Sequence, residues 1–493
     1  MSVKFVFPTT LSRATEGAAT LLVMAQHALF EGRPMGKLVG PDIHKWLVEL
    51  ARDVRPGDGG AVGSTLTGST LTGSTPRRIA LGALPDRVSR YNSDARPEAV
   101  HRVAAGAGLT KGKALKSAIL VVVTKPTQLG ATLNAIGRAF PLFSGESKAG
   151  DNTEIAIVAA NAKGQLIPID EADVRVMELA RNAARLVDTP PSQLHPEELA
   201  AEVRSALSAY KHVKISEITG DALLEAKLGG IHAVGRAALH PPRLIVAQYK
   251  PPKAAGAHVA LVGKGIVFDT GGLHMKHRGF MEGMKSDMGG AAACLGAFCA
   301  MVEEKLPRKL SLVLCIAENA VGPLAYKPDD IITMHSGKTV EINNTDAEGR
   351  LLLADGVSFA ARVLGADVII DAATLTGAQP LSTGMVHAAV MSNDARLEKA
   401  LVTAGFVSGD LVHPLPFCPE LFQAEFKSPV ADMRNSVKNR SNAQSSCAAQ
   451  FIWSHVDDTS VIWGHVDLAG PAFRADRGTG YGVALLAETV RSL

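Results

Sequence analysis

The segment NTDAEGRL (344–351) places two carboxylates and a guanidinium at alternate positions between apolar runs. In an extended backbone, residues two apart point to the same side, so Asp346, Glu348 and Arg350 would converge on one spot. In a helix, Asp346 and Glu348 would diverge. Apolar residues then recur at helix spacing as far as Leu364, so we expect a strand, an acidic turn and a helix. Enzymes of the α/β class keep their chemistry at such turns, although an isolated acidic turn can equally be an ordinary solvated loop.

A second charged cluster lies among glycines between residues 262 and 290. Its charged members are Lys264, Asp269, Lys276 and Asp287. Residues 258–262 form a short apolar strand candidate before it, and residues 291–303 carry an apolar stripe at helix spacing after it. Phosphate binding is a competing interpretation of such a loop, but the spacing G-x-x-x-x-G-K-[ST] is absent. The pattern again predicts a strand, a glycine-rich loop and a helix.

Together the clusters supply four carboxylates and three cations. Four acids brought together repel one another unless they are protonated or neutralised, and two divalent ions would neutralise them while activating a water molecule at neutral pH. A set of oxygen ligands favours magnesium, manganese or zinc. No paired histidine or cysteine spacing typical of zinc fingers or of the H-E-x-x-H helix occurs in the sequence.

Four segments carry a family resemblance. They are VGKGIVFDTGGLHMK (262–276), MKSDMGGAAA (284–293), NTDAEGRLLLAD (344–355) and DAATLTGA (371–378). This set resembles the catalytic signature of the leucine aminopeptidase family, the cytosolic two-metal hexameric exopeptidases. Weaker similarity extends the resemblance over residues 180–493, whereas residues 1 to about 165 match the family only in position and size.

The resemblance implies a role for each charged residue. It makes Lys264, Asp269, Asp287 and Glu348 ligands of a tightly bound metal ion, and it makes Asp269, Asp346 and Glu348 ligands of an exchangeable one. A lysine ligand must be a neutral amine, and a nearby dication disfavours its proton. The ions implied are zinc or manganese, with magnesium and cobalt as alternatives.

Two cations are implied to act without binding metal. Lys276 would stabilise the tetrahedral oxyanion formed when a metal-activated hydroxide attacks the peptide carbonyl. Arg350 would hold a bicarbonate ion that serves as the general base. The free amino group of the substrate would bind the exchangeable metal, which explains why such a site removes only the first residue.

The resemblance also implies a pocket for the first side chain of the peptide. Its residues would be Met284, Thr374, Leu375, Gly377, Ala469 and Ala472. They are uncharged and mostly small, so a leucine or methionine side chain fits and a charged one would be left unpaired. We interpret His274 and His277 as surface histidines, because the metal ligands are already complete, and His465 as a hydrogen-bonded core residue.

Composition narrows the cellular setting. The 493 residues suggest two or more domains, and 46% apolar with 20% charged residues is typical of a globular chain. A net charge of +3 gives no electrostatic signature of nucleic acid or membrane binding. No apolar run approaches the roughly 18 residues of a membrane helix, and the first residues do not resemble a signal peptide. Five cysteines, an odd number, fit reduced buried thiols, so we expect a cytoplasmic protein.

Glycine and proline breaks suggest the domain organisation. We expect an N-terminal open α/β domain (1–165), a connecting helix within 166–190, and a larger α/β catalytic domain (191–493) with a central mixed sheet flanked by helices. A tandem STLTG repeat marks residues 56–76 as a flexible insertion. In the first domain we expect strands at 3–7, 78–84, 118–124 and 154–159, and helices at 12–30, 97–107 and 128–139.

The resemblance further implies a homohexamer whose active sites open into an enclosed cavity, so that only short peptides are cleaved. Two other functions stay open. The first is a non-catalytic assembly or nucleic-acid-binding role, which no basic cluster supports. The second is a two-metal phosphoesterase, from which the apolar pocket and the two catalytic cations distinguish a peptidase.

Overall fold

The computed structural model describes residues 3–67, 77–110, 116–147 and 152–493. Its contacts divide the chain into two compact units. The first comprises Met1–Arg181 with Phe406–Gly409, and the second comprises Asn182–Gly405 with Asp410–Leu493. Helix α6 (Glu171–Asp188) contains the boundary between them. The sequence analysis placed the end of the first domain at residue 165 and the end of the connecting helix at residue 190. These two limits stay a prediction.

The first unit is built on a seven-stranded sheet of order β1-β6-β5-β2-β4-β3, with β7 paired to β6. Its strands are β1 (Val3–Val6), β2 (Thr20–Gln26), β3 (Ala61–Thr67), β4 (Arg77–Leu84), β5 (Lys116–Val123), β6 (Thr153–Asn161) and β7 (Leu166–Ile167). Only β3 and β7 run antiparallel to their neighbours among the described strands. Its other helices are α1 (Leu11–Thr15), α2 (Arg33–Val39), α3 (Pro41–Asp53), α4 (Pro97–Gly106) and α5 (Leu129–Arg138). This is the expected open α/β arrangement.

Two sequence predictions in this unit need correction. The helix expected at 12–30 is wrong beyond α1, because residues 20–26 form β2. Residues 21–25 of that strand are all apolar, and periodicity cannot distinguish a buried strand from a buried helix in such a run. The flexible insertion expected at 56–76 is wrong for residues 61–67, which form β3 and pair with β4. Alternating threonines favour a strand there, while residues 68–76 lie outside the described part.

The second unit contains an eight-stranded mixed sheet of order β16-β15-β18-β14-β10-β11-β9-β8. Its strands are β8 (Val213–Thr219), β9 (Arg243–Tyr249), β10 (Val259–Asp269), β11 (Leu310–Asn319), β14 (Val368–Ala373), β15 (Ala388–Ser392), β16 (Val412–Pro414) and β18 (Ile462–Asp467). The central strands β18, β14, β10 and β11 are parallel. The main helices are α7 (Pro196–Leu207), α9 (Gly229–Gly235), α10 (Gly289–Glu303), α11 (Gly349–Arg362), α13 (Ala395–Ser408), α15 (Gln444–Trp453) and α16 (Val483–Ser492). The expected mixed sheet flanked by helices is confirmed.

Short elements complete the second unit. They are α8 (Ala222–Glu225), α12 (Gln379–Thr383), α14 (Pro419–Phe422), a three-stranded sheet of β12 (Ile331–Thr333), β13 (Thr339–Glu341) and β17 (Met433–Arg434), and a hairpin of β19 (Phe473–Arg474) and β20 (Arg477–Gly478). Among the described residues, none of the helices is both long and apolar enough to cross a membrane.

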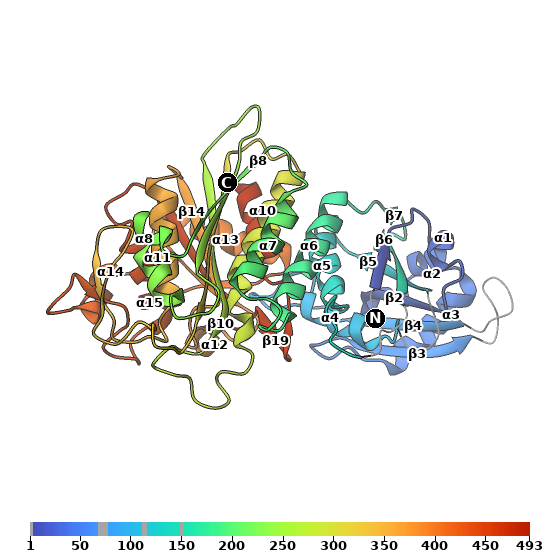
Figure 1. The fold of residues 1–493 in the computed structure, drawn as a ribbon. Helices are drawn as coiled ribbons and strands as arrows, with labels where there is room; N and C mark the ends of the chain where they lie inside the picture. The colour runs from blue at the N-terminus through green and yellow to red at the C-terminus, as the bar shows by residue number, and fades with distance from the viewer. Residues whose placement is uncertain (1–2, 68–76, 111–115, 148–151) are drawn as a thin grey trace. The chain divides into compact units, whose positions relative to one another are not determined.

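Strand β10 is the point at which the chain reverses its direction across the central sheet. From β10 the chain passes through α10 to β11 on one side, and from β11 it passes through α11 to β14 on the other. Figure 1 shows α10 and α7 on one face of this sheet and α11 and α15 on the other. Ligands of α/β sheets bind outside the carboxyl ends of the strands at such a reversal.

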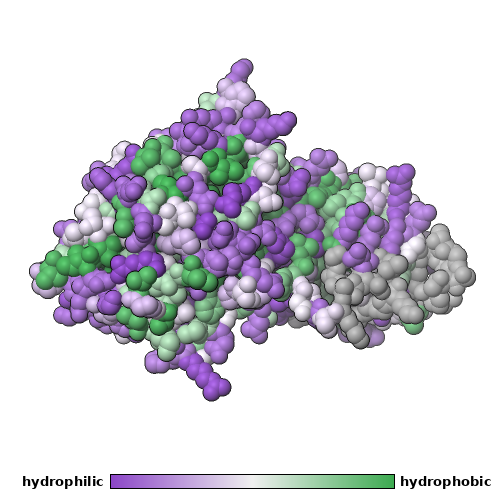
Figure 2. Space-filling view, in the orientation of Figure 1, coloured by the Kyte–Doolittle hydropathy of each residue, from purple (hydrophilic) through white to green (hydrophobic). Residues whose placement is uncertain are grey.

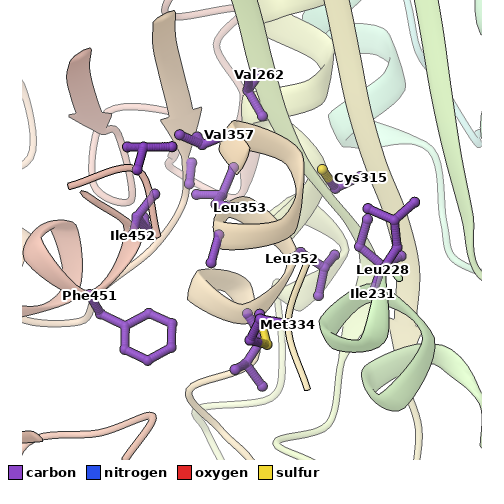
Figure 3. Close-up of a cluster of buried hydrophobic side chains, with 14 of the residues drawn as sticks. Leu228, Ile231, Val262, Cys315, Met334, Leu352, Leu353, Val357, Phe451 and Ile452 are labelled. Carbon is purple, nitrogen blue, oxygen red and sulfur yellow. The ribbon is translucent and has the colours of Figure 1, made fainter. Parts of the chain in front are cut away.

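Helix α11, which follows the acidic turn, is fixed by a buried hydrophobic cluster (Figure 3). Its residues Leu352 and Leu353 are fully buried. They lie among Val262 of β10, Ile231 of α9 and Ile452 of α15. Truncating a buried leucine typically costs about 2–5 kcal/mol, so this packing holds the start of α11 firmly against the sheet.

A buried ion pair also joins the central strands. His465 of β18 is fully buried, and its Nδ1 pairs with Asp371 of β14. The other oxygen of Asp371 accepts a 2.7 Å hydrogen bond from Trp463 Nε1. Burial lowers the pKa of His465, but the Asp371 carboxylate outweighs it, so the pKa is raised. The prediction of a hydrogen-bonded core histidine is confirmed.

Candidate active site

The charged residues of the two sequence clusters meet at the carboxyl ends of the central strands. Asp269 ends β10, Asn319 ends β11, and Thr374 directly follows β14. The amide of Asn319 donates a 2.7 Å hydrogen bond to Asp269 Oδ1. Lys264 also belongs to β10. This strand is therefore longer than the expected 258–262, and both charged residues lie on it rather than in a loop.

Lys264 joins two carboxylates that come from different helical crossovers. Its Nζ lies 2.7 Å from Asp287 Oδ1 and 2.8 Å from Glu348 Oε1. It also donates a 2.9 Å hydrogen bond to the backbone carbonyl of Thr374. The Thr374 hydroxyl donates a 2.7 Å hydrogen bond to Asp287 Oδ1. All four residues are less than a tenth exposed, so water does little to weaken these interactions.

Lys276 joins the remaining two carboxylates. Its Nζ lies 2.8 Å from Asp269 Oδ2 and 2.6 Å from Asp346 Oδ1. The chain brings Lys276 back over the end of β10 through Gly271 and Gly272, which have φ angles of +85° and +63°. Such angles favour glycine because a Cβ atom would be strained. The Gly271 N–H donates a 2.8 Å hydrogen bond to Asp269 Oδ1, which fixes this turn.

The alternation of charged residues predicted an extended acidic segment, but the segment is not extended. Glu348 has helical angles (φ −75°, ψ −40°), and Arg350 lies in the first turn of α11. The two acids nevertheless converge with Asp269, because carboxylate oxygens of Asp269, Asp346 and Glu348 all lie within 4.8 Å of one another. Arg350 is buried, and its Nη1 donates a 3.0 Å hydrogen bond to the backbone carbonyl of Asn435.

Burial and mutual repulsion destabilise the ionised form of these acids, and the nearby lysines only partly compensate for this. Burial raises the pKa of Glu348, Asp269 raises it further, and Lys264 lowers it without restoring the ordinary value. Burial likewise raises the pKa of Asp287. Burial lowers the pKa of Lys264, but Asp287, Glu348 and Asp269 outweigh this effect and raise it. The cluster therefore attracts further cations.

The donor set fits divalent metal ions. Asp287 Oδ2 is buried and has no hydrogen-bond partner among the described residues, so one oxygen is available to a ligand. Asp269, Asp346 and Glu348 offer three more carboxylates within 4.8 Å. Oxygen ligands with one deprotonated lysine amine suit magnesium, manganese or zinc.

These residues line a cavity of about 1040 Å³. The lining contains most of the residues that the sequence singled out: Lys264, Asp269, Lys276, Asp287, Asp346, Glu348, Met284, Thr374, Leu375, Gly377 and Ala469. Arg350 and Ala472 do not belong to the described lining, and they are only 5% and 3% exposed. Asp346 is the most accessible ion-paired carboxylate of the set, with 35% of its side chain exposed.

Several supporting residues were missed from the sequence. Asn319 holds Asp269, and the Tyr326 hydroxyl donates a 2.6 Å hydrogen bond to the Thr345 carbonyl. Asn435 donates to the backbone carbonyls of Asn344 (2.6 Å) and residue 347 (3.3 Å). The only local signal was an amide ending an apolar strand at Asn319; Tyr326 and Asn435 act across long sequence separations.

The two histidines beside Lys276 line the cavity but form no ion pair with a described acid. His274 is exposed, and its Nδ1 accepts a 3.0 Å hydrogen bond from the Thr345 N–H. His277 is exposed as well. Neither belongs to a group of described residues that could bind a metal ion. His274 instead ties the loop after β10 to the acidic turn.

Family models match both parts of the chain. Residues 181–487 match the catalytic domain of the cytosol aminopeptidase family, and residues 58–149 match the M17 aminopeptidase N-terminal domain 2. A probable aminopeptidase NPEPL1 of Mus musculus is 48% identical over 418 residues, covering 82% of this chain and 78% of that protein. Leucine aminopeptidase 1 of Caenorhabditis elegans is 49% identical over 310 residues, covering 62% and 63%.

Solved structures share the whole architecture. The leucyl aminopeptidase of Trypanosoma brucei in complex with bestatin has a TM-score of 0.91 and 35% identity, covering 100% of this chain and 95% of that one. The bottromycin maturation enzyme BotP in complex with manganese has a TM-score of 0.78 and 26% identity, covering 96% and 99%.

Gly349 gives a test of the site geometry. A Cβ atom on Gly349 would lie 2.6 Å from Lys264 Cε and 2.7 Å from its Nζ. We expect Gly349→Ala to displace this amine and to weaken metal binding roughly 10- to 100-fold, the range for disturbed ligand shells. Metal titration followed by elemental analysis measures the change.

The matched control is Gly106→Ala at the end of α4, where the nearest atom to a new Cβ is 3.9 Å away. Melting temperatures of both variants should stay close to that of the unmodified chain, because Lys264 is a flexible side chain. Unchanged metal affinity in Gly349→Ala would contradict the assigned position of Lys264.

Proposed function

Since the chain belongs to the cytosol aminopeptidase family and is a metal-dependent aminopeptidase, we propose that the cavity removes the N-terminal residue from short peptides, preferring apolar residues such as leucine and methionine. The observation that carries this proposal is the network of four carboxylates and two lysines at the cavity wall. This network combines a metal-binding donor set with Lys276, a cation outside the proposed ligand set. Uncharged pocket residues lie beside it.

The metal ligands follow from the donor set. Lys264, Asp269, Asp287 and Glu348 would hold one ion, and Asp269, Asp346 and Glu348 would hold the other. When bound, the two ions polarise the peptide carbonyl and lower the pKa of a bound water. We propose zinc or manganese, since BotP, a structural neighbour, is known in complex with manganese.

Lys276 is the candidate for stabilising negative charge on the reacting carbonyl oxygen. Its Nζ lies in the cavity lining, and 14% of its side chain is exposed. Burial lowers its pKa, but Asp269 and the other acids raise it above the ordinary value. In the metal-free site these acids keep Lys276 protonated, and we propose that its ammonium group stabilises a developing oxyanion.

Arg350 is the candidate for holding a bicarbonate ion. Burial lowers its pKa to about 10, so it remains charged at neutral pH. Its Nη1 is engaged with Asn435, but its Nε is buried and has no hydrogen-bond partner among the described residues. A guanidinium with an unused N–H matches a small planar oxyanion.

One uncharged part of the lining fits an apolar preference. Met284, Leu375 and Ala469 offer no charge, and Gly377 has no atom within 4 Å of where a Cβ would lie. A leucine side chain can occupy this open space, while a charged side chain would lose its hydration without gaining a partner.

We propose a cytoplasmic setting for this activity. Relatives of Leifsonia xyli and Streptomyces coelicolor are named probable cytosol aminopeptidases. The five cysteines, all within the described residues, are free thiols, and four of them are buried. Free buried thiols are typical of a reducing compartment.

Substitutions separate the metal ligands from the non-ligand cation. Glu348→Ala should lose bound metal, because Glu348 is shared by both proposed sites. Arg350→Ala should keep its metal and lose turnover by about 10²- to 10⁴-fold, the range for general acid and base chemistry. Elemental analysis and kcat on leucyl amide measure the two effects. Loss of metal from Arg350→Ala would contradict its proposed role.

Gly377 tests the pocket. We expect Gly377→Leu to fold normally, because no atom lies within 4 Å of the new Cβ, and to fill the space for the substrate side chain. The ratio of kcat/KM for leucyl amide over alanyl amide should fall at least about tenfold. Gly377→Ala is the matched control and should change the ratio little. An unchanged ratio in Gly377→Leu would place the pocket elsewhere.

We propose that the chain assembles as a hexamer with the active sites enclosed. Large apolar side chains are exposed on the second unit, among them Leu421 (67%) and Val430 (63%). Figure 2 shows a hydrophobic area at the left edge of the view, where Figure 1 draws α14. Exposed apolar areas of this kind are typical of interaction surfaces.

Light scattering coupled to size exclusion should give six chains of 51.6 kDa per particle. Enclosure should also make short peptides far better substrates than a folded protein with an accessible N-terminal leucine. An active particle of a single chain, or equal rates on both substrates, would rule out this assembly.

A further inference from the structure

A second cluster of metal-binding side chains lies in the second unit, apart from the active-site cavity. His195 directly precedes α7, Glu197 lies in the first turn of that helix, and His240 lies between α9 and β9. One possible ligand atom from each lies within 4.8 Å of the other two. None of the three lines the described active-site cavity.

The two imidazole rings are stacked. Their centroids are 3.5 Å apart and their planes differ by 3°. Neutral imidazole is the form that binds metal ions.

Each ring has an acid beside it. His195 Nε2 lies 3.8 Å from Glu198 Oε1, and His240 Nδ1 lies 3.8 Å from Glu197 Oε2. These separations are too long for hydrogen bonds, and His195 Nδ1 is buried without a partner among the described residues. These nitrogens of His195 and His240 therefore make no hydrogen bond to the neighbouring acids and could bind a ligand.

A third acid, Glu318, lies nearby on β11. Burial raises the pKa of Glu318, and the charges of His240 and His195 lower it. Together with Glu197 and Glu198, it offsets the unfavourable placing of a cation near the N-terminus of α7, where the helix dipole is positive.

We propose that His195, His240 and Glu197 bind one divalent transition-metal ion, zinc by preference. Two imidazoles and a carboxylate are the ligands that zinc shares with copper, nickel and cobalt, whereas magnesium and calcium prefer oxygen alone. Zinc bonds to these atoms are about 2.0–2.2 Å long, so tetrahedral ligands lie roughly 3.3 Å apart. The lone pairs of two parallel rings do not converge on one ion, so binding requires the partly exposed His195 and His240 rings to rotate out of their stacked arrangement about χ1 and χ2.

The site would join two segments of the second unit: the start of α7 and the segment between α9 and β9. An ion that binds only the folded chain stabilises it. We therefore assign the site a structural role, independent of the ions proposed in the cavity.

Zinc content tests this assignment. The unmodified chain and His195→Ala/His240→Ala are equilibrated with the same buffered free Zn²⁺, freed of excess by gel filtration and analysed for zinc per chain. We expect the double variant to hold one zinc fewer and to gain less melting temperature on zinc addition. Cavity ions contribute equally to both proteins, so the difference remains measurable even if the proposed function fails.

His212→Ala is the matched control, because His212 is exposed and lies outside the cluster; it should hold as much zinc as the unmodified chain. Equal zinc in the double variant and the unmodified chain would overturn the proposal.

Glu197→Gln keeps the test decisive if the double variant does not fold, because 59% of the Glu197 side chain is exposed. Glu197→Gln should weaken zinc binding at the histidine cluster at least about tenfold, the range for altered ligand shells. Visible absorption of the cobalt-loaded protein should lose its tetrahedral bands in this variant. Unchanged zinc affinity together with an unchanged cobalt spectrum would overturn the proposal.

Discussion

Buried carboxylates repel one another, and the second unit is organised around compensating that repulsion. Asp269, Asp287 and Glu348 are each no more than 5% exposed, so water cannot screen them. Lys264 and Lys276 supply the nearest positive charges. Both lysines and Asp269 come from β10 and the turn after it, while Asp287 and Glu348 come from separate crossovers. The compensation therefore exists only once β10, α10 and α11 have packed together.

Lys264 links this electrostatics to metal binding. Its ammonium holds Asp287, Glu348 and the Thr374 carbonyl at 2.7–2.9 Å. The same carboxylates are proposed metal ligands, so a lysine that gives up its proton exchanges three hydrogen bonds for one metal bond. Because the acids retain raised pKa values beside the lysines, the lysines alone do not satisfy them. The site favours a dication over the proton it displaces.

The sequence predicted the chemistry of the site better than its geometry. Asp269, Asp287, Asp346 and Glu348 were identified from two acidic, glycine-bounded segments, and the structure brings them together. Alternation predicted an extended segment, but α11 starts at Gly349, and Arg350 lies buried in its first turn outside the described cavity lining. Propensity rules see only neighbouring residues, whereas tertiary packing decides where a helix begins.

The same limit explains the other differences in the fold. Residues 21–25 are continuously apolar, and only pairing with β4 and β5 makes them part of a strand. Asn435 supports the acidic turn across about ninety residues of sequence, which no local pattern reveals. Two adjacent residues of β11 show how such long-range contacts connect distant features. Successive strand side chains point to opposite faces: Asn319 holds Asp269, while Glu318 feels the charges of the stacked histidines. The end of β11 therefore carries one side chain that positions an active-site acid and one whose pKa depends on the histidine cluster, and neither relation can be read from the local sequence.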